Sequence, residues 1–238
     1  MLDVNKSLHY NYVREIENTY IISLENNELS QKFTERCIDS CNKVGQTYKI
    51  WNAFDGISGK IIIPKHLEDK HYLSWLKLYN TSLTPTQVAC FFSHFSLWCH
   101  CIEIDSPIVI LEHDAIMVEK YDFYNGYGII VYLGSHEQAH GSHLSAIPPH
   151  ATDYDGHWRS ICRAHAYSID PVSAKNLVSS VINSGITESL DIYIRSDLFA
   201  IVQFGLYAYD DPYLYSNDKI ESTIHKNWEY ENHWRKLN

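Results

Sequence analysis

Glu112 and Asp114 are two carboxylates separated by a single residue, and they directly follow the apolar run Pro107 to Leu111. A continuous apolar run of this kind predicts a central strand covered on both faces. In an extended chain, side chains two positions apart point to the same side, so the pair can hold one hard divalent cation such as Mn2+ or Mg2+. An acidic strand end that is only solvated has the same pattern, and the pattern alone leaves both interpretations open.

The segment from His136 to His140 reads His-Glu-Gln-Ala-His and matches the H-E-x-x-H zinc pattern of many metallopeptidases. That chemistry needs a helix that places both histidines on one face, with Glu137 as the general base. Gly134 and Gly141 bracket the segment and leave too little room for such a helix, which would also lack an apolar face. A zinc metallopeptidase is therefore the less favoured alternative.

The elements that must position these residues begin with Thr19 to Leu24, a β-branched and apolar run that predicts a strand. A helix from Glu28 to Lys43 and a second strand from Thr47 to Trp51 follow. This βαβ opening predicts an α/β fold with a mixed, mostly parallel central sheet, helices on both faces, and ligands at the carboxyl ends of the strands. Asp55 and Gly56 come just after the second strand and are expected on that edge, although an ordinary Asp-Gly turn has the same sequence.

The clearest predicted helix starts at Thr84, with Pro85 at its first position and Gln87 completing a capping box. Apolar residues recur at helical spacing at positions 88, 91, 92, 95, 98 and 102, so one face of this long helix is expected to be buried. Ser93 and His94 are expected beside that face. A histidine in such a place is more often a hydrogen-bonded structural residue than a catalyst.

The rest of the sequence predicts further strands and helices around a long loop at residues 134–160, which is rich in His and Gly and has no sustained periodicity. We interpret this segment as an active-site loop and residues 225–238 as a basic and aromatic tail of one domain that spans residues 1–238. The expected elements are strands at Gly128 to Leu133, Ile161 to Ile169, Leu198 to Phe204 and Leu206 to Tyr209, the last two completing the sheet, and helices at Pro171 to Ile182 and Glu188 to Arg195.

The composition limits the class of protein. The 238 residues are 45% hydrophobic and carry a formal net charge of -10, which predicts a folded chain without general attraction to polyanions. The six cysteines include no CxxC pair and are expected to be reduced thiols. The sequence has no apolar stretch long enough to span a membrane, and its start lacks the apolar core of a signal peptide, so we expect a cytoplasmic protein. It does not indicate an oligomeric state.

Four sequence blocks in order, with three weaker ones after them, resemble the glycosyltransferase family that contains the lipooligosaccharide galactosyltransferases and the collagen galactosyltransferases. The resemblance spans nearly the whole chain, and the order and spacing of the blocks make it specific. The blocks are Tyr20 to Leu24, Trp51 to Gly56, Leu83 to His94 with Trp98, Ile108 to Ala115, Ala166 to Ile169, Leu190 with Asp191, and Glu221 to Ile224.

The resemblance implies a GT-A-like fold that binds a nucleotide sugar, expected to be UDP-linked, usually with manganese or magnesium, and that transfers the sugar to a hydroxyl with inversion. It also implies a role for each matching residue. Ser23, Asp55 and Gly56 would lie near the nucleoside, Ser93 and His94 would border the donor pocket, Glu112 and Asp114 would hold the metal, and Asp191 would be the base that deprotonates the acceptor. Similar folds often bring a late histidine to the metal, and His225 is that candidate here.

Two sites depart from the family pattern. His113 stands where the family's Glu-Asp-Asp motif has its middle acid, and Thr86-Gln87 stands where the family usually has Gly-Glu at the start of the long helix. The middle side chain of an extended triplet points away from the other two, so metal binding is expected to survive. The altered motif also leaves open the alternative that the protein is a non-catalytic relative, which binds a saccharide or nucleotide without turnover. The expected acceptor is a saccharide, and a hydroxymethylated DNA base is the next candidate because cations beside aromatic rings, as in the tail, also suit stacked bases.

Overall fold

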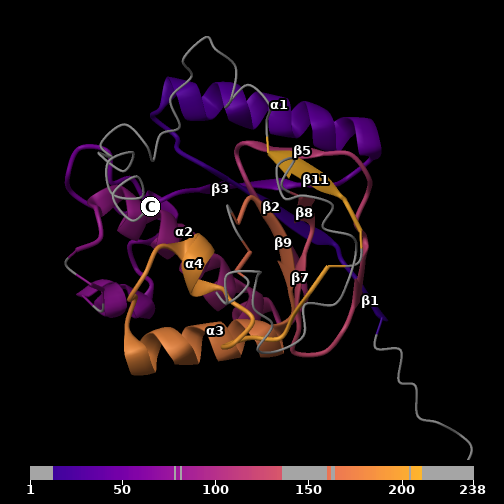
Figure 1. Ribbon diagram of the computed structural model, residues 1–238. Helices are drawn as coiled ribbons and strands as arrows, with labels where there is room; N and C mark the ends of the chain where they lie inside the picture. The colour runs from indigo at the N-terminus through magenta and orange to yellow at the C-terminus, as the bar shows by residue number, and fades with distance from the viewer. Residues whose placement is uncertain are drawn as a thin grey trace, which may run out of the picture.

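The computed structural model describes residues 13–77, 79–80, 82–135, 160–161, 164–203 and 205–210. Its centre is a six-stranded sheet with the order β10-β7-β9-β4-β2-β3 (Figure 1). Neighbouring strands are parallel except around β9, which runs antiparallel to both β4 and β7. The strands are β2 Asn18–Ser23, β3 Lys49–Asn52, β4 Ile108–Glu112, β7 Ile130–Tyr132, β9 Ala166–Ile169 and β10 Ile201–Val202.

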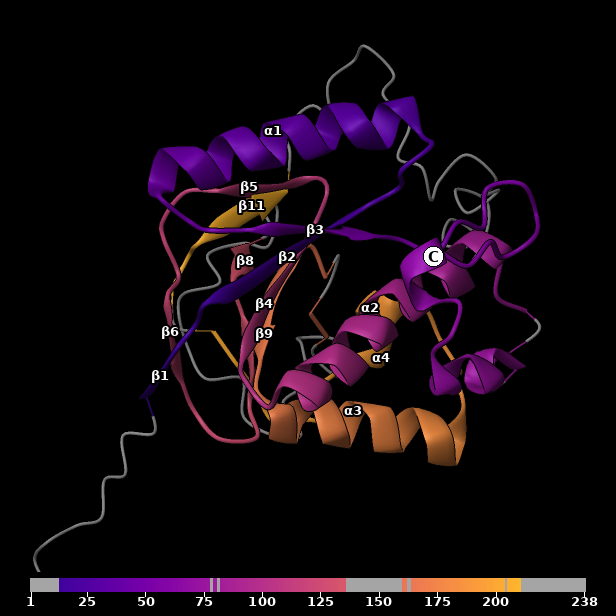
Figure 2. The same ribbon diagram turned by 180° about the vertical axis from the view of Figure 1, so that it is seen from behind.

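Helices cover both faces of this sheet, as Figures 1 and 2 show from opposite sides. Helix α1 (Glu28–Val44) packs against one face, and helices α2 (Pro85–Ile104) and α3 (Pro171–Ser184) pack against the other. The strands alternate between the two cores, so that Ile110 belongs to the core under α2 while Val109 and Leu111 belong to the core under α1. This mixed α/β architecture confirms the predicted GT-A-like fold class.

Smaller elements complete the fold around the central sheet. Two strands form a separate pair, and three others form a second small sheet that adjoins the α1 side. These are β1 Val13–Glu15 with β6 Phe123–Asn125, and β5 Ala115–Met117 with β11 Ala208–Asp210 and β8 Gly134–Ser135. The short helix α4 (Leu190–Tyr193) and two 3-10 helices, Lys65–Leu67 and His71–Lys77, lie outside the sheet.

The helix starts follow the sequence signals closely. The Thr84 hydroxyl accepts a hydrogen bond from Gln87 N, and the Gln87 side-chain oxygen accepts one from Thr84 N, which is the predicted capping box at the start of α2. At the start of α1, the Asn27 side chain accepts from Ser30 N at 2.8 Å. Each cap satisfies a backbone donor that the first helical turn leaves without an intrahelical partner.

Several strand predictions are corrected. The strand predicted at Ile161 to Ile169 is only Ala166–Ile169, and of the segment Leu198 to Phe204 only Ile201–Val202 joins the central sheet. The segment Leu206 to Tyr209 does not complete that sheet, because β11 pairs with β5 and β8 instead. Apolar character predicts an extended segment but carries no information about its pairing partner, which is decided in three dimensions. Gly134–Ser135 forms β8, and residues 136–159 and the tail at 225–238 lie outside the described residues.

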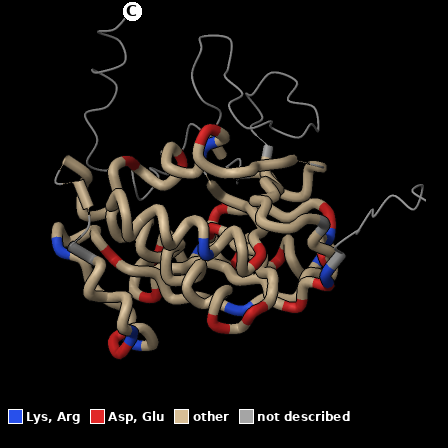
Figure 3. The backbone as a smooth tube through the Cα atoms, turned by 90° about the horizontal axis from the view of Figure 1, so that it is seen from below, with Lys and Arg blue, Asp and Glu red and all other residues tan. Residues whose placement is uncertain are grey.

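Acidic and basic residues are interspersed along the described backbone, without a wholly basic face in the view of Figure 3. Within the described part of the chain, no helix is both long and apolar enough to cross a bilayer.

Candidate functional site

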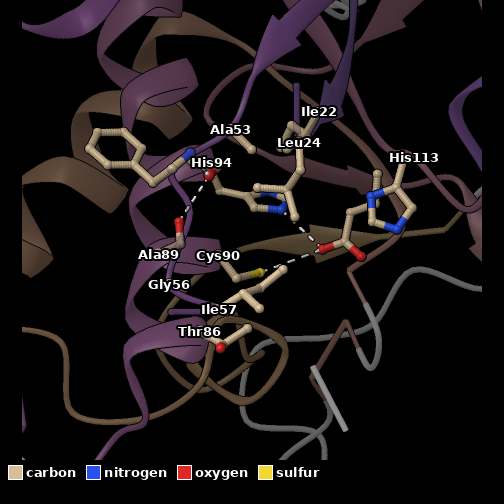
Figure 4. A pocket seen from close by; sticks show the side chains of 13 residues that line it. Ile22, Leu24, Ala53, Gly56, Ile57, Thr86, Ala89, Cys90, His94 and His113 are labelled. Atoms are coloured by element: carbon tan, nitrogen blue, oxygen red, sulfur yellow. Dashed lines mark hydrogen bonds and ion pairs between the residues drawn. The ribbon is translucent and has the colours of Figure 1, made fainter. Parts of the chain in front are cut away.

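The carboxyl ends of β2, β3 and β4 meet the N-terminal half of α2 around a pocket (Figure 4). This is the edge of the sheet at which α/β folds bind their ligands. Most lining groups are apolar or backbone, with polar side chains on one side. The pocket is lined by Ile22, Leu24, Ala53, Phe54, Gly56, Ile57, Thr86, Ala89, Cys90, Ser93, His94, Glu112 and His113.

The chain after β3 lies tightly against the start of α2, and Gly56 is the residue that permits this. A Cβ at this position would stand 2.2 Å from the backbone oxygen of Pro85, so no larger residue fits without a shift of the backbone. Ser93 fastens the same segment, because its hydroxyl accepts from Phe54 N at 2.9 Å and donates to the Ala89 carbonyl at 2.8 Å. Gly56 and Ser93 therefore shape one wall of the pocket.

Asp55 and Ser23, the other two residues expected near the nucleoside, do not line this pocket. The Asp55 carboxylate accepts from Ile57 N at 2.8 Å, which is the contact of an ordinary turn-forming aspartate. The Ser23 hydroxyl is buried on the α1 side of the sheet, 2.7 Å from the hydroxyl of Thr34 and 3.2 Å from Gln31 Nε2. Both side chains thus have structural hydrogen bonds.

His94 lies at the centre of a buried polar network rather than beside a buried face as expected, because α2 is covered on nearly all sides. Its Nε2 is 3.1 Å from Glu112 Oε1 and its Nδ1 is 2.9 Å from the Tyr167 hydroxyl. Tyr167 also accepts from Trp98 Nε1 at 2.9 Å. Burial lowers the pKa of His94 to about 3, so the imidazole is neutral at physiological pH.

At the end of β4, the side chains of Glu112 and His113 point to opposite sides of the sheet. Glu112 faces α2, where its Oε1 meets His94 and lies 3.9 Å from Cys90 Sγ. His113 faces α1, where its Nδ1 is 3.3 Å from the Ser30 hydroxyl and its ring packs against Phe33. The middle residue of the triplet therefore does not share the α2 side with Glu112.

The two acids have the features that a bound cation would explain. Burial, and then the negative charge of Asp114, raise the pKa of Glu112 well above its ordinary value. Asp114 Oδ1 is buried and has no hydrogen-bond partner among the described residues. A buried carboxylate oxygen without a donor is costly, and a second carboxylate nearby adds repulsion. A hard divalent cation would satisfy both groups, so the residues present fit the expected Mn2+ or Mg2+.

Asp191 lies in the first turn of α4 and is close enough to Glu112 and Cys90 to act on them electrostatically. Its negative charge contributes to the raised pKa values of both Glu112 and Cys90. Its Oδ1 accepts from the Ser189 hydroxyl at 2.7 Å, and α4 is held to α2 by the edge-to-face contact of Tyr193 with Phe91. The fold thus brings the predicted base, which is distant in sequence, to the acidic turn.

Two residues of this region were not predicted. Cys90 is one helical turn before His94, and that spacing is the signal that could have found it. His165 precedes β9, whose antiparallel register pairs Ala166 with Leu111 and so brings the His165 carbonyl within 2.8 Å of Glu112 N. Nothing in the sequence indicates that antiparallel pairing. His225 and the H-E-x-x-H segment at 136–140 lie outside the described residues.

A mixed α/β sheet with paired carboxylates at the end of a central strand, beside a pocket that runs onto a helix start, fits the class of nucleotide-sugar-dependent transferases. The chain matches the family described as Glycosyltransferase family 25 (LPS biosynthesis protein) over residues 16–194. It belongs to this glycosyltransferase family. The matched range includes every candidate site residue except His225. No curated protein matches the chain.

Proposed function

We propose that this glycosyltransferase moves a sugar from a UDP-linked donor to a hydroxyl of a saccharide acceptor, with a hard divalent cation held by Glu112 and Asp114. The observation that carries the proposal is the buried Asp114 Oδ1, which has no hydrogen-bond partner among the described residues and lies near the partly buried carboxylate of Glu112. Two such carboxylates are stabilised by a cation, and the same cation can neutralise the diphosphate of a nucleotide sugar bound next to them. His225 remains a proposed additional ligand.

The shape of the pocket supports a donor placed with its nucleoside toward β2 and β3. Leu24, Ala53 and Ile57 offer an apolar wall of the kind that receives a flat base, while the Glu112 carboxylate lines the pocket at the β4 side. A donor in this orientation has its diphosphate at Glu112 and Asp114. The close packing of Gly56 on α2 leaves backbone, rather than a side chain, as part of that wall.

In the proposed reaction the acceptor oxygen attacks the anomeric carbon as the bond from that carbon to the phosphate oxygen breaks, which inverts the anomeric centre. A bound cation supplies neutralisation of the negative charge that develops on the departing UDP. Asp191 takes the proton of the attacking hydroxyl through its Oδ2, because its Oδ1 already accepts from Ser189.

We infer a saccharide acceptor rather than a nucleic acid from the charge of the protein. The chain carries a formal net charge of -10, and its described basic residues are interspersed with acids, so a phosphate backbone finds no general attraction. A hydroxymethylated DNA base remains the second candidate, carried by the aromatic and basic tail at residues 225–238. Duplex DNA binding that weakens steeply with added salt would favour this second acceptor.

The donor and the metal are tested together by thermal denaturation with a panel of nucleotide sugars, with and without Mn2+. A UDP sugar at ~100 times its dissociation constant should raise the melting temperature by roughly 5 to 10 °C, and only when Mn2+ is present. Asp114→Ala should abolish this shift. Asp69→Ala removes an exposed carboxylate and serves as the matched control.

Slow release of UDP from the donor in the presence of Mn2+ then separates a transferase from a relative that only binds. We expect this release in the wild-type protein and its loss in Asp114→Ala. An unchanged, metal-dependent donor response in Asp114→Ala would contradict the assigned metal site. Binding without any release, under conditions where an acceptor is also supplied, would identify a non-catalytic relative.

A further inference from the structure

Three atoms beside the pocket have the types and spacing of a zinc site. Cys90 Sγ, His94 Nε2 and Glu112 Oε1 lie within 4.8 Å of one another (Figure 4). Thiolate, imidazole and carboxylate are all zinc ligands, and thiolate in particular favours soft ions over Mn2+ and Mg2+. Cys90 and His94 are one turn apart on α2, so both reach the end of β4 from the same side.

The hydrogen bonds behind His94 decide whether this set can ligate. Trp98 Nε1 can only donate, so the Tyr167 oxygen accepts from it at 2.9 Å. The Tyr167 hydroxyl proton then points to His94 Nδ1, 2.9 Å away, which is the remaining partner among its described hydrogen bonds. A neutral imidazole whose Nδ1 accepts must carry its proton on Nε2, and this proton is donated to Glu112 Oε1 at 3.1 Å.

We propose that Trp98 and Tyr167, acting through His94, are positioning residues that select the cation. They hold a proton on His94 Nε2, which keeps the Cys90, His94 and Glu112 set from binding zinc. The same proton fixes Glu112 Oε1 toward α2 and leaves Oε2 as the oxygen that serves the hard cation with Asp114. The role of Oε2 rests on the proposed function, whereas the tautomer and the exclusion of zinc do not.

The exclusion has a physical cause in the second hydrogen bond of the imidazole. For zinc to bind, the Cys90 thiol must release its proton to solvent and the imidazole proton must move from Nε2 to Nδ1. Nδ1–H would then face the Tyr167 hydroxyl, whose own proton would lose its acceptor in a fully buried place. Ligating histidines usually donate their second N–H to a good acceptor, and a tyrosine that already accepts from Trp98 is a poor one.

The inference is tested by removing the Tyr167 hydroxyl and titrating the tag-free, metal-free protein with Co2+ as a probe for zinc. Tyr167→Phe should develop the near-ultraviolet absorption of a thiolate bound to Co2+, and the wild-type protein should not. In competition with a chromophoric chelator, Tyr167→Phe should bind Zn2+ at least about tenfold more tightly than wild type. The double variant Tyr167→Phe with Cys90→Ser should lose the absorption.

Tyr193→Phe is the matched control, because it removes another tyrosine hydroxyl of the buried core, the one bonded to Ser180, without a contact to His94. It should behave as wild type. A wild-type absorption that Cys90→Ser removes would overturn the proposal, and so would a folded Tyr167→Phe that shows none. If Tyr167→Phe does not fold, Trp98→Phe frees the tyrosine oxygen to accept from Nδ1–H and should give the same absorption.

The tautomer is read directly by nitrogen NMR of His94 in the metal-free protein. We expect the proton on Nε2 in the wild-type protein, where Nδ1 faces the Tyr167 hydroxyl and Nε2 faces Glu112. A wild-type proton on Nδ1 would refute the proposal. Should the wild-type protein bind neither Mn2+ nor any nucleotide sugar while the tautomer and Co2+ results hold, only the proposed function and the role of Oε2 fail.

Discussion

The two faces of the central sheet carry polar side chains at the same carboxyl edge, but they use them differently. On the α1 face, Ser23, Thr34 and Gln31 form hydrogen bonds to one another or to nearby carbonyls. On the α2 face, His94 and Glu112 are hydrogen-bonded to each other, yet nearby Asp114 has a buried oxygen without a partner among the described residues. Among the described residues, side chains of α2 and β4 line the pocket, whereas no side chain of α1 does.

This contrast shows that a polar residue at a strand end is not in itself a ligand for substrate. Ser23 and Ser93 are both buried serines whose hydroxyls join two segments of the chain. Ser23 ends β2 and bonds Thr34 of α1, whereas Ser93 is on α2 and bonds Phe54 after β3. Ser93 holds a pocket wall, whereas Ser23 joins β2 to α1. What separates them is their surroundings, because Ser93 lies against the pocket near the carboxylates, and among the described residues Asp114 Oδ1 there is buried without a hydrogen-bond partner.

The largest effect is expected from the acid that α4 contributes to the α2 face. Asp191→Asn should lower kcat by roughly 10²- to 10⁴-fold, because the acceptor hydroxyl loses its base. The donor-induced thermal shift should remain as in wild type, since the donor does not need this carboxylate. Steady-state transfer assays with saturating donor measure the change. Full activity in Asp191→Asn would show that α4 supplies no catalytic group. It would also weaken the contrast between the α1 and α2 faces of the sheet.

The two neighbouring acids Glu112 and Asp114 should also make the stability of the metal-free protein depend on pH. Burial and the charge of Asp114 raise the pKa of Glu112 to about 8 from 4.5, so the folded state keeps a proton that the unfolded state releases. Stability should therefore fall as pH rises between these values, by on the order of 3 kcal/mol relative to Glu112→Gln. The reference variant is needed because His94, with its pKa lowered to about 3 by burial, stabilises the fold as pH rises toward 6.5.

Urea denaturation of both proteins at pH 5 to 8 measures this difference. Added Mn2+ should reduce the pH dependence of the wild-type protein and leave that of Glu112→Gln less affected. Parallel stability curves for the two metal-free proteins would show that Glu112 is not held in a strained ionisation state. The α2 face would then resemble the α1 face at this edge, where Ser23, Thr34 and Gln31 are hydrogen-bonded.

A smaller effect should separate the two serines. Ser93→Ala leaves the buried Phe54 N–H without its acceptor and should cost about 1 to 3 kcal/mol. It should also weaken donor binding, because the chain after β3 loses its attachment to α2. Ser23→Ala should cost about 1 kcal/mol, since Thr34 and Gln31 both keep other partners, and donor binding should not change. Equal losses of donor affinity in the two variants would contradict the contrast.

The smallest effect is expected at the helix caps, one for each face. Asn27→Ala and Thr84→Ala each remove a side-chain acceptor at a helix start and should each cost about 1 kcal/mol. Only Thr84→Ala should also lower donor affinity, because the first turn of α2 borders the pocket through Thr86. Thermal denaturation with and without the UDP sugar identified in the donor panel measures both effects.

Much of the central architecture could be predicted from the sequence. The capping box at Thr84 and the apolar run before Glu112 are local signals, and local signals suffice when the physics is local, as in a helix cap or a buried strand. The alternation of Glu112 and His113 likewise follows from the period of an extended chain. The pairing of β11 with β5 was not predictable in this way, because strand partners are chosen by packing among distant segments.

The acidic pair and the family resemblance were therefore determined by the sequence alone, since both depend on residue types at short, fixed spacings. Tertiary structure decided which side chains satisfy those acids. The antiparallel strand β9 brings Tyr167 to His94 across the sheet, and α4 brings Asp191 to the end of β4. A hydrogen bond or a charge acts over a few ångströms of space regardless of separation along the chain, so only the folded protein could place Trp98 and Tyr167 behind Glu112.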